Sequence, residues 1–321
     1  MNPYAFIVGC PRSGTSLLQR MVDAHPVIAI TPETNWIARA LAASHCDGDV
    51  PVTGDLVERV TTHRRFGDLG IDEVTARRLA GKADTFAAFV SAIFDLYGQK
   101  QDKELVGDKT PGYVRSIPTL NGLFPEARFA HIIRDGRDVC LSLLNWDKLP
   151  KILGRLAGSE DYVFTAALFW EWNVRLGREA GLGLGPRLYY ELRYESLVRQ
   201  PEATSAALCR FLDLPYDARM VGFHEGRTRH EPGLSAKRAW LPVTAGLRDW
   251  RRQMPPGDAA RFEAVAGDLL EELGYPRSVA RLPGSVWRRA TELRASFSEH
   301  AAVRGSPLPR SRWAAATQAV Q

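Results

Sequence analysis

The chain has 321 residues, of which 45% are hydrophobic, and a formal net charge of +5. This length and apolar content suit one long α/β domain with a full core and exclude a disordered chain. Residues 277–321 hold eight arginines against two glutamates, a net charge of +6, so residues 1–276 carry about −1 and show no charge pattern for nucleic-acid binding.

Targeting and metal signals are lacking in the sequence. No segment resembles a secretory signal or reaches the length of a membrane span, so we expect a cytoplasmic protein. The four cysteines and the carboxylates show no metal-ligand spacing, so we expect reduced thiols and no metal. Cys10 lies in a tight loop, where a small tolerated residue is favoured over a reactive thiol.

Residues 9–16 read Gly-Cys-Pro-Arg-Ser-Gly-Thr-Ser, after an apolar run and before an amphipathic stretch. This order predicts a strand, a phosphate loop and a helix. Thr15 stands where an ATP- or GTP-binding loop has its lysine, and the nearest cation is Arg12. Backbone N–H groups and the helix dipole still suit one phosphate, so we expect a nucleotide with a single 5′-phosphoryl group. The alternative is a turn that binds nothing.

A second strand is predicted over residues 128–133, followed by an apolar helix over residues 139–144. Arg134 comes directly after this strand, and Ser142 follows eight residues later, about two helical turns into the helix. The carboxyl ends of parallel strands form the ligand edge of an open α/β sheet. An arginine and a hydroxyl placed there can bind one phosphate together.

Residues 33–102 read mostly as short helices, expected over 33–44, 56–66, 71–79 and 85–97. Insertions at the ligand edge of such a sheet shape the acceptor pocket, so this segment is the candidate substrate cap. A second candidate is the Pro- and Gly-containing region 146–162, and a core-facing helix is expected over residues 166–180.

The sequence resembles the sulfotransferases that use 3′-phosphoadenosine 5′-phosphosulfate (PAPS), in particular the bacterial type and the glycosaminoglycan and protein-tyrosine branch. The resemblance rests on PRSGTS after the first strand and on the strand-terminal arginine with its serine. It extends to the R-Y-E block at 193–202, the C-R-F-L stretch at 209–212 and the G-L-R-D-W-R segment at 246–251. These matches follow the family's order from residue 5 to about residue 275.

The resemblance implies a P-loop NTPase-like three-layer α/β fold with a central parallel sheet, formed by a sulfotransferase domain over residues 1–276. It also implies sulfuryl transfer from PAPS to a hydroxyl or amine of a carbohydrate, lipid or natural product, with 3′-phosphoadenosine 5′-phosphate (PAP) as product and no metal. Two alternatives stay open. One is a small-molecule kinase, which Thr15 disfavours, and the other is a non-catalytic nucleotide-binding module.

The nucleotide contacts are also implied by the resemblance. The 5′-phosphosulfate group would be bound by Arg12, Ser13, Gly14, Thr15 and Ser16, and the 3′-phosphate by Arg134 and Ser142. Three residues from the later blocks complete the nucleotide site, namely Tyr194, Arg248 and Trp250.

Sulfuryl transfer needs a base for the acceptor's proton and cations for the developing negative charge. The resemblance assigns the base to Glu33 and the cations to Lys109 and Arg12. Glu33 could instead stabilise the first turn of a helix, and Lys109 could form a structural ion pair with Asp108. If Glu33 is not the base, the candidates are His224 and His230.

The basic tail, residues 277–321, is expected to be helical or partly disordered. Val286, Ala290, Leu293 and Phe297 form an apolar stripe at helical spacing, with arginines including Arg294 elsewhere on the helix. This helix could pack on the body, bind an anionic partner or lie on a membrane surface.

Overall fold

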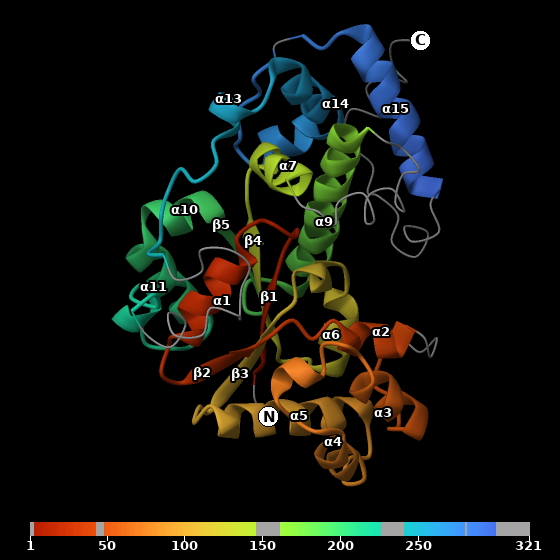
Figure 1. Cartoon of the computed structure of the whole chain (residues 1–321), viewed down its shortest axis with the longest axis vertical. Coiled ribbons are helices and arrows are strands. Elements are labelled where there is room, and N and C mark those ends of the chain that lie inside the picture. Colours follow the sequence, from red (N-terminus) through yellow and green to blue (C-terminus); the bar gives the residue numbers. More distant parts are fainter. Residues whose placement is uncertain (1–2, 43–47, 146–160, 226–240, 280, 300–321) are drawn as a thin grey trace. The chain divides into compact units, whose positions relative to one another are not determined.

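The structure is a computed structural model, and it describes residues 3–42, 48–145, 161–225, 241–279 and 281–299 (Figure 1). The candidate loop at 146–160 and His230 lie outside these residues. The chain divides into two compact units. Unit 1 comprises Met1–Ile132 and Ala180–Ala245, and unit 2 comprises Ile133–Glu179 and Gly246–Gln321. Across the described ranges, no helix combines the length and hydropathy needed to cross a bilayer.

Unit 1 is built on a five-stranded sheet with the order β2-β3-β1-β4-β5. Strands β1, β3 and β4 pair in parallel, with Ala5 opposite both Gly107 and Arg128, and β2 pairs in parallel with β3. The central parallel sheet with flanking helices confirms the expected fold class. The strands are β1 (Ala5–Val8), β2 (Ile28–Thr31), β3 (Leu105–Lys109), β4 (Arg128–Ile133) and β5 (Tyr189–Arg193).

Helices cover both faces of the sheet. The side chains of β1 contact both layers, because successive side chains of a strand point to opposite sides. Phe6 and Val8 join the core formed with α2 to α6, whereas Ala5 and Ile7 join the core formed with α1, α10 and α11. Two short 3-10 turns on the first face and one on the second complete the layers. The bounds are α1 (Thr15–Asp23), α2 (Trp36–Ala42), α3 (Gly54–Thr61), η1 (Gly67–Leu69), α4 (Glu73–Ala80), α5 (Phe86–Lys100), η2 (Pro111–Arg115), α6 (Ile117–Leu123), α10 (Tyr194–Arg199), α11 (Pro201–Phe211) and η3 (Ala218–Met220).

The cap segment forms short helices, as its sequence pattern predicts, but their boundaries differ from the expected ones by one to five residues. Thr53, Asp72 and Thr85 cap α3, α4 and α5 by accepting backbone N–H groups of the first turn. Helix α2 begins at Trp36 rather than at Glu33. The reason is the left-handed conformation of Asn35 (φ 57°), which cannot lie inside a right-handed helix. Helix α3 ends at Thr61, short of the expected residue 66.

Unit 2 contains helices α7, α13, α14, α15 and most of α9. The apolar stripe of the tail packs inside this unit. Leu293 and Phe297 are buried, and the Phe297 ring meets Trp172 edge-on with the ring centroids 5.8 Å apart. Residues 284–299 therefore take the packing alternative, and residues 300–321 lie outside the described residues. The bounds are α7 (Gly136–Leu144), α9 (Tyr162–Leu184), α13 (Trp250–Gln253), α14 (Pro256–Glu272) and α15 (Gly284–Glu299).

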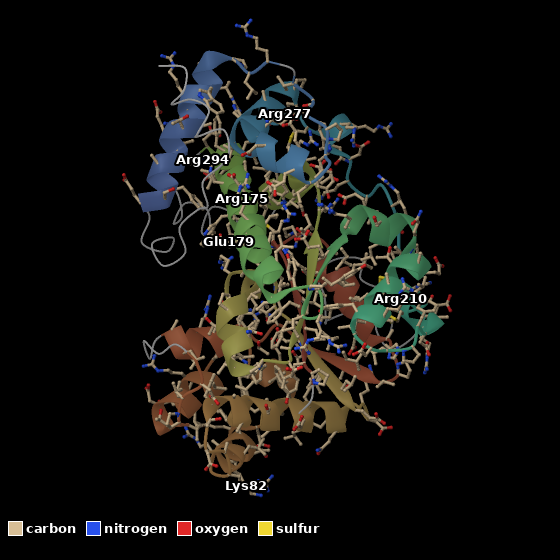
Figure 2. The ribbon with its side chains drawn as sticks, turned by 180° about the vertical axis from the view of Figure 1, so that it is seen from behind. Lys82, Arg175, Glu179, Arg210, Arg277 and Arg294 are labelled. Carbon is tan, nitrogen blue, oxygen red and sulfur yellow. The ribbon has the colours of Figure 1, made fainter. Side chains whose placement is uncertain are left out.

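The expectation that the arginines of α15 lie away from the packed face is wrong for Arg294. Its Nη2 donates to the fully buried Glu171 at 2.5 Å and to the backbone oxygen of Val265 at 2.8 Å. The other Glu171 oxygen is 2.9 Å from Arg175 Nε. Figure 2 labels Arg175 and Arg294, the two arginines that share this carboxylate. Two arginines on one buried carboxylate thus link α15 to α9.

Replacement of Arg294 by Met should lower the free energy of unfolding by about 2 to 4 kcal/mol, because it leaves a buried carboxylate with one of its two cations. Urea denaturation measures this loss. Arg289→Met is the matched control, since Arg289 pairs with Glu292 on the exposed side of the same helix and should cost less than about 0.5 kcal/mol. Equal losses for the two variants would contradict a structural role for the Arg294 pair.

Candidate functional site

The phosphate loop connects β1 to α1 and has the backbone that its sequence requires. Gly14 is the N-cap of α1 in the left-handed region (φ 98°), and Arg12 is also left-handed (φ 77°). A Cβ on Gly9 would lie 2.5 Å from the backbone oxygen of Ile132 on the neighbouring strand. Glycine is therefore required at position 9 for close packing and at position 14 for the turn into the helix.

Tyr194 lies against this loop. It follows β5 directly and begins α10, and a Cβ on Gly14 would be 2.4 Å from its ring. Ser13 is fully buried, and its Oγ has no hydrogen-bond partner among the described residues. A buried hydroxyl without a partner is costly unless a ligand oxygen completes it. The loop thus fits an anionic group such as a phosphate or phosphosulfate.

Lys109 joins the phosphate loop to Glu33. It is the last residue of β3, whose neighbours in the sheet are β1 and β2, so its side chain reaches both the loop and the end of β2. Its Nζ donates to Glu33 Oε1 at 2.9 Å and to Ser16 Oγ at 3.5 Å. Only 6% of the Lys109 side chain is exposed. The structure therefore brings together three residues that the sequence predicts for the site.

Glu33 lies in the link between β2 and α2, outside the helix, so it does not stabilise a first helical turn. Burial raises its pKa, but Lys109 and Arg65 outweigh this effect and hold the pKa of Glu33 below its ordinary value. The Arg65 Nη2 is 3.0 Å from Glu33 Oε2. Glu33 is therefore ionised at neutral pH, the form that a general base needs.

The backbone that carries Glu33 is fixed by the residues at the end of β3. Thr34 N donates to Thr110 Oγ1 at 3.0 Å, and Thr34 Oγ1 is 2.8 Å from the Tyr113 hydroxyl. The same hydroxyl accepts the backbone N–H of Ile37 at 3.0 Å. Thr110 and Tyr113 are not among the site residues predicted from the sequence, although their place just after a strand end could have indicated them.

Asp108 is a second buried carboxylate at this edge. It accepts a hydrogen bond from Thr31 Oγ1 at 2.9 Å, and it lies beside Lys109 in the chain. Burial raises the pKa of Asp108 to about 6, against an ordinary value of 3.8, despite hydrogen bonds from threonines. Lys109 makes its ion pair with Glu33.

In unit 2, Asp138 of α7 links two predicted nucleotide-binding segments. Its Oδ2 is 3.4 Å from Arg134 Nη2, and its Oδ1 accepts the backbone N–H of Trp250 at 2.8 Å. Arg134 is 7% exposed and its backbone oxygen accepts the indole N–H of Trp170 at 3.2 Å. The segments around positions 134 and 250 are thus brought together by Asp138.

Helix α7 also contacts Arg248. The Arg248 Nη1 is 3.5 Å from the backbone oxygen of Leu141, the residue before Ser142, and Ser142 is 5% exposed. The Arg137 guanidinium stacks on the Trp250 ring, with its central carbon 3.6 Å from the indole centroid. Arg137, which is not among the residues predicted from the sequence, is fully buried and also pairs with Glu263 at 2.7 Å.

The surroundings of the other candidate residues favour structural roles for them. His224 lies 3.5 Å from Glu225, and no described contact joins it to Glu33. Cys10 is fully buried, and burial raises the pKa of its thiol, which favours the structural interpretation of this residue. Trp170 and Trp172 are buried, as expected for the core-facing helix predicted over residues 166–180.

Comparisons with known proteins show which family the chain resembles. Residues 3–218 match the family model described as "Sulfotransferase family". The chain is 26% identical over 280 residues to protein-tyrosine sulfotransferase A of Caenorhabditis elegans, covering 85% of this chain and 67% of that protein. It is 28% identical over 282 residues to protein-tyrosine sulfotransferase 1 of Homo sapiens, covering 85% and 70%. The sulfotransferase domain of the Synechococcus PCC 7002 olefin synthase has a similar fold, with a TM-score of 0.58 and 23% identity over 86% of this chain and 95% of that one.

The raised pKa of Asp108 predicts a pH-dependent stability. Between about pH 4 and pH 6 the folded chain holds a proton on Asp108 that the unfolded chain has lost, so this group's contribution falls as pH rises through the folded pKa. Asp108→Asn removes this titration. The wild-type free energy of unfolding minus that of the variant should fall by about 2 kcal/mol from pH 4 to pH 8, measured by urea denaturation. A difference that stays constant with pH would contradict the burial argument.

Proposed function

Because the chain belongs to the sulfotransferase family, we propose that it transfers a sulfuryl group from PAPS to an acceptor hydroxyl or amine and releases PAP. The observation that carries the proposal is the contact of Lys109 with both Glu33 and Ser16. Through these contacts a candidate base and a candidate cation lie beside a phosphate loop.

For the donor, we assign the 5′-phosphosulfate group to Arg12, Ser13, Gly14, Thr15 and Ser16. The left-handed turn at Gly14 and the buried Ser13 hydroxyl support this assignment, and the start of α1 suits an anion. We assign the 3′-phosphate to Arg134 and Ser142 and the rest of the nucleotide to Tyr194, Arg248 and Trp250. Their convergence on α7, and that of Tyr194 on the loop, supports these roles.

In the proposed reaction, the acceptor oxygen or nitrogen attacks the sulfur in line with the bond to the bridging oxygen. The new bond forms to sulfur, the old sulfur–oxygen bond breaks, and its electron pair stays on the 5′-phosphate of PAP. The acceptor proton moves to the Glu33 carboxylate. Lys109 and Arg12 stabilise the charge that grows on the sulfuryl and leaving oxygens. By analogy with phosphoryl transfer, positioning and charge stabilisation supply most of the catalysis.

The acceptor is a small molecule in this proposal, with a hydroxyl or amine on a carbohydrate, lipid or natural product. The relatives are named for protein tyrosine, so a phenolic hydroxyl belongs in the first test. The test is incubation with PAPS and separate phenol, sugar, lipid and amine acceptors, followed by mass spectrometry. One acceptor that gains the mass of a single SO₃ group supports the proposal, and ATP-dependent phosphorylation with no sulfation would favour the kinase alternative.

The 3′-phosphate assignment predicts a nucleotide preference. PAP should bind more tightly than adenosine 5′-phosphate, and Arg134→Ala should weaken PAP binding about ten- to 150-fold, because charged hydrogen bonds of about 1.5 to 3 kcal/mol are lost. Isothermal titration calorimetry measures both. Arg261→Ala, at an exposed position of α14, is the control of equal charge. Equal affinities for the two nucleotides would refute the assignment.

The base assignment predicts that Glu33→Gln lowers turnover about 10²- to 10⁴-fold, because the amide keeps the shape but cannot take the proton. PAP affinity should change little. Glu73→Gln removes a carboxylate from an exposed ion pair and serves as the control. The measurement is single-turnover transfer from bound PAPS. A Glu33→Gln enzyme that keeps more than about a third of wild-type turnover would remove Glu33 from the base role.

A further inference from the structure

The second oxygen of Glu33 is held by a residue of the cap. Lys109 Nζ is 2.9 Å from Oε1, and Arg65 Nη2 is 3.0 Å from Oε2. Arg65 lies between α3 and η1, far along the chain from the strand ends that carry the other two residues. The carboxylate is thus bound on both oxygens by cations from two different elements, and its orientation depends on both.

The chain around Arg65 is itself fixed. The next residue, Phe66, is 2% exposed, and its ring packs against Trp36 of α2 with the centroids 6.0 Å apart. The backbone N–H of Arg65 points to His63 Nδ1 at 3.3 Å, and that of Phe66 donates to the His63 backbone oxygen at 2.8 Å. Trp36 follows Glu33 by three residues, so the same aromatic contact sets the position of Arg65 over Glu33.

We propose that Arg65 is a positioning residue for sulfuryl transfer, which fixes the Glu33 carboxylate by pairing with Oε2 while Lys109 pairs with Oε1. The inference rests on the proposed role of Glu33 as the base. It gives the cap a part in the reaction beyond shaping the acceptor pocket, since the cap supplies one of the two cations that orient this carboxylate.

The charges that face Glu33 define what removal of Arg65 would do. Lys109 from β3 and Arg65 from the cap are the two cations, and the Asn35 side chain donates a hydrogen bond. Asp68 pairs with Arg65 at 3.8 Å, and Asp108, whose pKa burial raises to about 6, precedes Lys109 in the strand. Loss of Arg65 leaves one cation on Glu33 and frees Asp68, so both changes disfavour the ionised form of Glu33.

Two opposing effects follow for the reaction. A carboxylate bound by two cations is ionised to lower pH, but it is also a weaker base. A carboxylate bound by one cation is more basic but can rotate away from the acceptor, and misplacement of a catalytic group costs more than the gain in basicity. We therefore expect Arg65→Gln to lower turnover about tenfold and to move the acid limb of the pH profile to higher pH.

The first test needs no acceptor. The pH titration of the Glu33 carboxyl carbon is followed by NMR in protein labelled with ¹³C-glutamate, with the signal assigned by its absence in Glu33→Gln. Arg65→Gln should raise the midpoint of this titration. The matched control is Arg64→Gln, which removes an equal charge from the exposed neighbouring position and should shift the midpoint less. Equal midpoints in the two variants would overturn the proposal, whether or not sulfuryl transfer occurs.

The second test is turnover against pH with PAPS and a sulfated acceptor from the panel. Arg65→Gln should lose about tenfold in turnover with unchanged PAP affinity, and Arg65→Lys should recover part of the loss. A loss of PAP affinity in step with turnover would overturn the positioning role in favour of donor binding. Absence of sulfuryl transfer by the wild type would instead refute the proposed function, while the NMR titration still decides whether Arg65 acts on Glu33.

Discussion

The ion pair between Lys109 and Glu33 depends on the register of three parallel strands. Lys109 pairs with Ile7 of β1, and Asp108 pairs with Thr31 of β2, so the end of β3 lies between the phosphate loop and the segment that carries Glu33. A shift of β3 by one residue would turn Lys109 to the other face of the sheet. The register of β3 between β1 and β2 therefore also sets the candidate site.

Two carboxylates at this edge of the sheet have pKa values that are shifted in opposite directions. Glu33 touches two cations and keeps a low pKa despite burial, whereas burial dominates at Asp108 and raises its pKa to about 6. Glu33 faces Lys109 and Arg65, whereas Asp108 accepts a hydrogen bond from Thr31. Environments that separate the pKa values of paired carboxylates are typical of acid–base sites.

Local sequence signals predicted much of the fold and the candidate site. The glycine spacing of residues 9–16, the apolar strand before Arg134 and the polar turn at Glu33 lie within a few residues of the elements they mark, so periodicity and composition suffice to find them. The strand-end positions of these residues follow from the parallel order of the sheet.

Contacts between distant segments could not be predicted in this way. Arg137 pairs with Glu263, 126 residues away, and Arg294 pairs with Glu171 across 123 residues. Arg65 looks like any other arginine of a helical segment, since only the packing of Phe66 on Trp36 brings it to Glu33. Tertiary packing brings these residues together, and the local sequence pattern does not predict which distant residues pack against each other.

The central claim is that Glu33 and Lys109 act as a unit beside the phosphate loop, and a double-mutant cycle on turnover tests it most directly. Single-turnover rates with bound PAPS are measured for Glu33→Gln, Lys109→Met and the double variant. If the two residues act together, the double variant should be little slower than the slower single variant. Losses that multiply, as they do for independent residues, would contradict the account.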